Sequence, residues 1–122
     1  MEQRVSQLNG WFAEQIGLCR QREQALLADD RADEAMFEKV RANVYDIFRT
    51  VLDVAVKTGG GDAEAVRRFF VCRMQTIPSG WAAAREKAAQ HQDPVRIQLE
   101  SIKLDAVEAI KVRFAAVWEG VE

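Results

Sequence analysis

The stretch MFEKVRANVYDIFRTVLDVAV, residues 36–56, holds the densest run of apolar side chains in the chain. An α-helix turns 100° per residue, so side chains three, four and seven positions apart share one face. Under that spacing a single stripe contains Met36, Phe37, Val40, Val44, Ile47, Phe48, Val51 and Ala55. We therefore expect a helix over residues 32–57 whose striped face lies at the centre of the protein core.

Helical spacing also continues on both sides of this segment, and no sustained β-strand alternation interrupts it. Turn-forming residues separate the helices at ADDRADE (28–34), TGGGD (58–62) and HQDPV (91–95). Asp62 and Asp93 are suited to cap the helices that follow them. The expected helices are 3–28, 32–57, 63–76, 79–90 and 94–119.

Pro78 divides the third of four rods, because proline lacks a backbone N–H donor and clashes with the preceding helical turn. The other three rods would each be about 38 Å long at 1.5 Å per residue. Matched rods with short connections predict an all-α, four-helix up-down-up-down bundle with the third rod broken at Pro78, giving five helical segments. A five-helix globule with a sharp turn at Pro78 is the alternative. Either arrangement would form a single domain over residues 1–122.

The 122-residue chain has a net charge of −2, with 17 basic and 19 acidic side chains scattered along it. Nucleic-acid-binding domains usually gather basic residues on one face, so we expect no nucleic-acid partner. No apolar run approaches the roughly 18 residues of a membrane-spanning helix. The N-terminus also lacks the basic and then apolar pattern of a signal peptide. We therefore expect a cytoplasmic protein without a membrane partner.

Residue types for metal binding or covalent catalysis are scarce in this sequence. A di-iron site in a helical bundle needs Glu-x-x-His motifs on two helices, but the chain has one histidine, His91. Cys19, Cys72 and His91 fall on different predicted elements, which argues against a zinc site. We predict no metal, no cofactor and no enzymatic activity. The two cysteines are interpreted as free thiols that fill the core.

One basic residue, Arg73, falls on the apolar side of the third rod. Its aliphatic stem could lie on apolar surface while its charged head reaches water. Alternatively, Arg73 lines a small polar pocket for an anionic ligand next to the Pro78 break. The second hypothesis gives a candidate ligand pocket formed by Arg73, Trp81 and Tyr45.

On helices 3–28 and 94–119, several large apolar side chains are displaced sideways from the main stripe. Such flanks either wrap a wide bundle core or form a surface for self-association. Symmetric dimers are the commonest oligomers, so we expect a homodimer. Its candidate interface residues are Trp11, Leu18, Leu104, Phe114 and Trp118, with Val121 on the same flank.

These observations favour a non-enzymatic, cytoplasmic helical-bundle protein that acts by protein–protein interaction. The alternative is a small-molecule-binding or sensor bundle with a pocket near the Pro78 kink. The two hypotheses differ in what they require of the structure. Interaction requires a filled core and an exposed apolar stripe, whereas sensing requires an enclosed cavity near Trp81.

Overall fold

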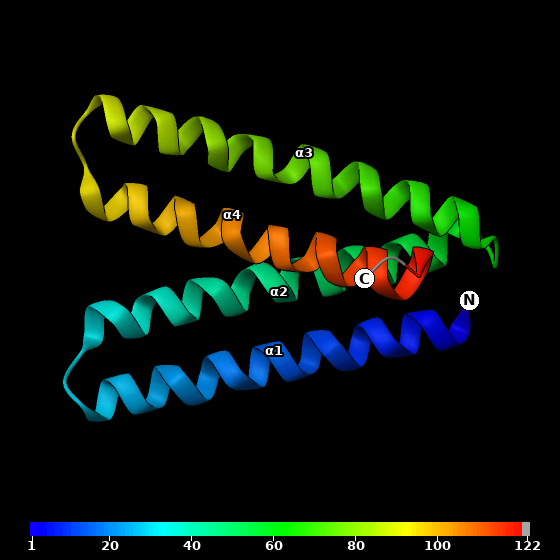
Figure 1. Cartoon of the computed structure of the whole chain (residues 1–122), viewed down its shortest axis with the longest axis horizontal. Helices are drawn as coiled ribbons and strands as arrows, with labels where there is room; N and C mark the ends of the chain where they lie inside the picture. Colours follow the sequence, from blue (N-terminus) through cyan, green and yellow to red (C-terminus); the bar gives the residue numbers. More distant parts are fainter. Residues whose placement is uncertain (121–122) are drawn as a thin grey trace.

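Four long helices joined by short turns make up the protein in a computed structural model, which describes residues 1–120 (Figure 1). Successive helices run in opposite directions, and the described residues contain no strand. The predicted all-α, four-helix up-down-up-down bundle is therefore confirmed. The elements are α1 (Glu2–Ala28), α2 (Ala32–Gly59), α3 (Ala63–Gln90), α4 (Pro94–Phe114) and a π-helical turn, η1 (Ala115–Glu119).

Local sequence explains where α3 and α4 begin. The side chain of Asp62 accepts a hydrogen bond from the backbone N–H of Glu64 at 3.0 Å. The side chain of Asp93 accepts one from the backbone N–H of Arg96 at 3.2 Å. Each satisfies one of the N–H groups that lack a partner in the first turn of a helix. Both expected caps are thus present.

The third rod is continuous, so the expected break at Pro78 is absent. Helix α3 runs from Ala63 to Gln90 with Pro78 inside it and buried. The hydroxyl of Ser79 donates to the backbone carbonyl of Thr76 at 2.6 Å, in the same turn as the proline. Burial of the proline ring against the bundle offsets the hydrogen bond that it cannot make. The additional helical segment is η1, at the far end of the chain.

The core is built around stacked aromatic rings. Phe70 of α3 stacks on Phe114 of α4 with ring centroids 4.6 Å apart, and Phe114 stacks on Trp118 of η1 at 5.3 Å. Phe48 of α2 meets Phe70 edge to face at 6.0 Å. Contacts of this kind add to the free energy gained by burying the rings. These ring contacts hold α2, α3, α4 and η1 against one another.

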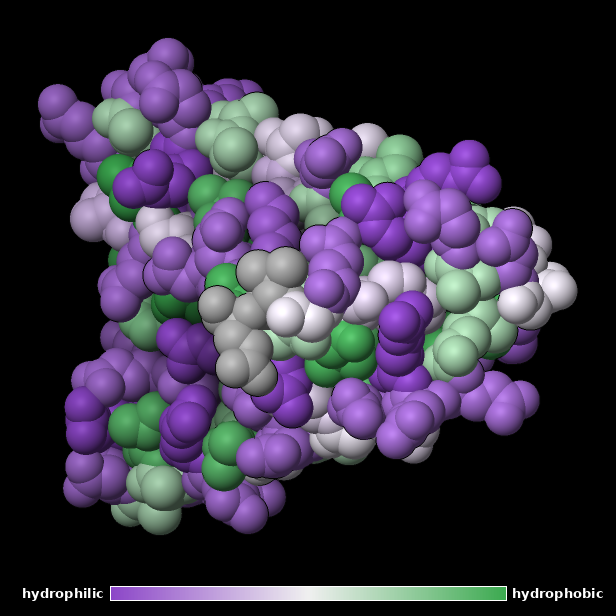
Figure 2. Space-filling model, turned by 45° about the vertical axis from the view of Figure 1, so that its right-hand side comes forward, coloured by the Kyte–Doolittle hydropathy of each residue, from purple (hydrophilic) through white to green (hydrophobic). Residues whose placement is uncertain are grey.

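The two helical hairpins, α1–α2 and α3–α4, converge at one end and diverge at the other (Figure 1). We call the end with the N-terminus, η1 and the α2–α3 turn the closed end. The other end, with the α1–α2 and α3–α4 turns, is the open end. Figure 2 shows a recess between two lobes at the open end, with apolar side chains at the base of the recess. The aromatic stack therefore ties the hairpins together mainly at the closed end.

Helix α2 buries only part of the arc that its sequence predicts: Val44, Phe48 and Ala55 are buried as expected. Tyr45 and Leu52 are buried, whereas Met36 and Ile47, which were expected in the core, are exposed. At 100° per residue the buried arc is rotated by about 90° from the predicted stripe. The reason is tertiary packing: α2 contacts α1 extensively, as well as α3 and α4, and its α1 side is drawn inward. The periodicity located an apolar helix and one side of its buried face correctly but misplaced the centre of that face.

Candidate functional site

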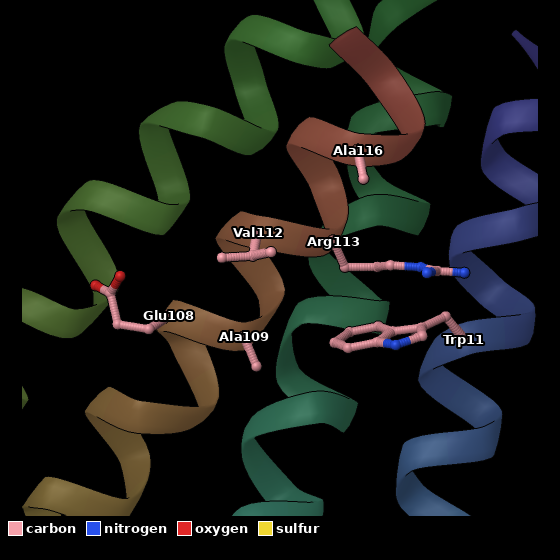
Figure 3. A pocket seen from close by; sticks show the side chains of 6 residues that line it. All are labelled: Trp11, Glu108, Ala109, Val112, Arg113 and Ala116. Carbon is pink, nitrogen blue, oxygen red and sulfur yellow. The ribbon is translucent and has the colours of Figure 1, made fainter. Parts of the chain in front are cut away.

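An apolar groove lies between α1 and the C-terminal half of α4 (Figure 3). Its volume is about 420 Å³. Val112 lines the groove and has 68% of its surface exposed. Such exposure is unusual for a large apolar residue that lies next to other exposed apolar side chains. The lining residues are Trp11, Glu108, Ala109, Val112, Arg113 and Ala116.

Trp11 forms the α1 wall of this groove and is held in place from behind. Its ring meets Phe12 edge to face at 5.4 Å and Tyr45 of α2 at 5.5 Å. Phe12 and Tyr45 are both buried, so these contacts anchor Trp11 to the core while part of its surface stays exposed. A rigid, partly exposed indole is the type of side chain that anchors many protein interfaces.

Helix α4 and the adjoining η1, which carries Ala116, supply the opposite wall through small and charged residues. Ala109 and Ala116 lie two helical turns apart and leave room beside the indole ring. Figure 3 shows Arg113 extending toward α1 beside Trp11, whereas Glu108 extends from another side of α4. The groove thus combines an apolar floor with one cation and one anion at its margins.

The candidate interface residues from the sequence are divided between surface and core. Trp11, Leu18 and Leu104 are half-buried. Phe114 and Trp118 are buried in the aromatic stack, so placing them at an interface was wrong. Phe114 of α4 stacks on Phe70 of α3, Trp118 of η1 stacks on Phe114, and their rings fill the closed end. Val121 lies outside the described residues.

The groove residues of α4 and η1 were missed by the sequence analysis. Ala109, Val112 and Ala116 are spaced three, four and seven apart, which places them on one face. Their spacing could have revealed that face, but alanine side chains are small, so Ala109 and Ala116 add little to the hydrophobicity of the pattern. The interface was instead predicted at Phe114 and Trp118, because their large side chains dominate the apolar pattern, but these two residues are buried.

The three residues of the candidate ligand pocket have separate surroundings. Arg73 is exposed, with its guanidinium 4.9 Å from the ring centre of Phe69. The ring of Trp81 lies 5.7 Å from the ammonium of Lys103, whereas Tyr45 is buried beside α1. Arg73 therefore follows the interpretation in which its stem covers apolar surface and its head reaches water.

A second cavity, about 440 Å³, opens between the hairpins at the open end. Apolar side chains from three helices line it, with charged groups of α2 beside them. Arg41 donates to Oε1 of Glu38 at 2.5 Å, whereas Oε2 of Glu38 is buried without a hydrogen-bond partner. The lining residues are Leu26, Glu34, Phe37, Glu38, Arg41, Gln98 and Ile102.

Cys19 and Tyr45 adjoin Glu38. Burial raises the pKa of the Cys19 thiol, and the Glu38 carboxylate raises it further. Burial is also the main cause that raises the pKa of Tyr45. A thiol held neutral in this way is a poor nucleophile. Cys72 is exposed rather than part of the core, which corrects the prediction that both cysteines fill it.

Within residues 1–120, no three His, Cys, Asp or Glu side chains are grouped as they would be around a metal ion. None of the helices in this range has the length and apolar character needed to cross a membrane. Comparison of the chain with protein-family models, curated proteins and solved structures found no match.

Proposed function

We propose that this protein acts in the cytoplasm by protein–protein interaction, without catalysis, and that the α1–α4 groove receives an amphipathic helix of a partner protein. The observation that carries the proposal is a predominantly apolar groove lined by both the exposed Val112 and the anchored Trp11. Contiguous exposed apolar surface of this kind marks interaction sites in soluble proteins. Helices commonly bind such grooves by inserting apolar anchors spaced three, four and seven residues apart.

The shape of the groove supports a helix as the occupant. Trp11 provides a large flat surface, and Ala109 and Ala116 leave space for side chains to insert opposite it. Glu108 and Arg113 carry opposite charges that could orient a partner with complementary charges along its polar margin. These residues lie on helices, whose backbones hold the groove in shape without a partner.

A site-specific photo-cross-linking experiment tests this proposal. A photoreactive amino acid at Val112 should give one defined cross-linked product in the cells of origin. The same amino acid at Gln75, which is exposed on α3, serves as the matched control. The Val112 product should disappear when Ala116→Glu introduces a charge into the groove. Equal products from both positions, or a product unaffected by Ala116→Glu, would contradict a partner in the groove.

The small-molecule alternative has its best support at the open end rather than near Pro78. The open-end cavity combines apolar Leu26, Phe37 and Ile102 with charged Glu38 and Arg41, a mixture found in many ligand sites. A thermal-shift screen of small anions and cations tests this alternative. Binding there should stabilise the protein, and Phe37→Glu should abolish the shift while Val112→Glu leaves it intact. A screen in which no compound shifts the transition contradicts it.

A further inference from the structure

A second exposed apolar surface runs along α2, on the arc that the sequence placed in the core. Met36, Ile47 and Val54 are 54%, 40% and 42% exposed, and Val40 is half-buried between them. We call these four residues the α2 stripe. It lies on a different helix from the two that form the α1–α4 groove, so it is a separate surface that the groove does not explain.

The α2 stripe has the spacing of a helix-pairing seam. Val40, Ile47 and Val54 recur every seven residues, and all three are β-branched. Met36, Asn43 and Thr50 alternate with these three residues along the helix, at steps of four and three. Asn43 and Thr50 are exposed, as Met36 is. Apolar residues at this spacing, with isolated polar residues among them, characterise helices that pair with another helix in a defined register.

The charges beside the α2 stripe show which way a second α2 helix would run. Lys39, Asp46 and Asp53 each stand one residue before a member of the stripe, so they form one margin of it. Lys39 lies toward the start of this margin and Asp46 and Asp53 toward its end, where Lys57 forms an ion pair with Asp53 at 2.9 Å. Two antiparallel copies of α2 bring Lys39 of each copy opposite Asp53 of the other, which gives two pairs of opposite charge against one approach of Asp46 to Asp46 at the twofold axis. In a parallel pair the same margins would lie on opposite sides of the seam, so Lys39 and Asp53 would not meet.

We propose that two copies of this chain pair through their α2 stripes, antiparallel and related by a twofold axis. In this register Ile47 packs on Asn43 of the second copy, Val54 packs on Met36, and Val40 packs on Thr50. Each copy contributes the same residues to both sides of this seam, as a symmetric dimer requires. Helix α2 therefore carries two packing faces, one for its own bundle and one for the second copy.

The molar mass in solution tests this pairing. Sedimentation equilibrium at micromolar concentrations should give a dimer of two 13.8 kDa chains for the wild type. Ile47→Glu places a charge in the seam of both copies and should raise the dissociation constant roughly 100-fold or more. Val112→Glu, the matched control in the groove, should leave the dimer intact. A wild-type monomer, or a dimer lost with Val112→Glu and kept with Ile47→Glu, overturns the proposal.

Charge exchange tests the direction of pairing. Lys39→Asp and Asp53→Lys should each weaken the dimer, because each places like charges opposite one another twice. The double variant Lys39→Asp/Asp53→Lys restores opposite charges and should return the dissociation constant to within a few-fold of wild type. If the double variant is as weak as the two single changes combined, antiparallel pairing is wrong.

Cross-linking provides an independent check of register in a Cys72→Ser background, which removes the exposed native thiol. Asp46 lies opposite Asp46 of the second copy, so Asp46→Cys should give covalent dimers with a short bis-maleimide reagent. Two copies of Lys39→Cys would lie about 21 Å apart along the helices at 1.5 Å per residue, and should not react together. Cross-linking of Lys39→Cys as fast as Asp46→Cys contradicts the register. The groove proposal does not depend on any of these results.

Discussion

The closed and open ends of this bundle are built from different kinds of side chain. At the closed end, Phe70, Phe114 and Trp118 stack in series across three elements. Toward the open end the buried residues include small alanines and Glu100, whose Oε2 has no hydrogen-bond partner in the described structure. Large stacked rings bury more apolar area than alanines, and a buried carboxylate adds a desolvation cost. The comparison indicates that the closed end supplies most of the stability, while the open end leaves the hairpins apart.

Truncation of the aromatic stack should have the largest effect. Phe70→Ala removes a fully buried ring that touches both Phe48 and Phe114 and should lower the free energy of unfolding by about 3–5 kcal/mol. Leu26→Ala at the open end removes a half-buried side chain and should cost clearly less. Urea denaturation followed by circular dichroism measures both. Equal losses would mean that stability is spread evenly along the bundle.

The buried carboxylate of Glu100 is expected to have the next largest effect. Its Oε1 lies 3.3 Å from the ammonium of Lys103 and 3.8 Å from Arg96. Lys103→Met removes the nearer partner and should lower the free energy of unfolding by about 1–3 kcal/mol, because a buried charge is left poorly paired. Glu100→Leu removes the charge itself and should leave stability unchanged or higher. Two comparable losses in urea denaturation would show instead that the pair is net stabilising.

Two glycines provide a matched comparison of the same substitution. A Cβ on Gly59, at the closed end, would lie 2.7 Å from Cγ2 of the buried Val66. Gly59→Ala should therefore cost about 1–3 kcal/mol through overpacking. Gly17 has open space around it within α1, so Gly17→Ala should stabilise the protein by about 0.5–1 kcal/mol. Melting temperatures that move in the same direction would contradict this account of the turn.

The smallest effect should be a loss of stability at alkaline pH. The pKa values of Cys19 and Tyr45 are raised in the folded state, above ordinary values of 9.0 and 10.0. Both groups therefore ionise more readily in the unfolded chain, so their contribution is present below pH 9 and is lost as pH rises through the folded-state values. The double variant Cys19→Ala/Tyr45→Phe should lose less stability than wild type between pH 7 and pH 10. An identical decline in both proteins would exclude these two groups as its cause.

The four rods, their order and the turns between them could be predicted from the sequence, because turns and caps depend on neighbouring residues. Asp62 and Asp93 illustrate this, since each caps through its own side chain. The continuity of α3 could not be predicted in the same way. Pro78 is tolerated because its ring is buried among side chains that are distant in the sequence.

The positions of the exposed surfaces were the least predictable feature. Periodicity shows how wide an apolar arc is, but not which part of it meets another helix. Two residues show this. Ile47 was predicted in the core but lies on the surface, and Trp118 was predicted at an interface but lies in the core. The apolar excess noted in the sequence was therefore real, but it lies along α2 and in the α1–α4 groove.

The central claim is that the exposed α2 stripe serves self-association. Sedimentation equilibrium tests it most directly, by measuring the molar masses of the wild type and of Ile47→Glu side by side. The account predicts that the wild type sediments as a dimer of 13.8 kDa chains and that Ile47→Glu sediments as the 13.8 kDa monomer. A wild type that stays at 13.8 kDa at every micromolar concentration would contradict it, as would a dimer that Ile47→Glu leaves unchanged.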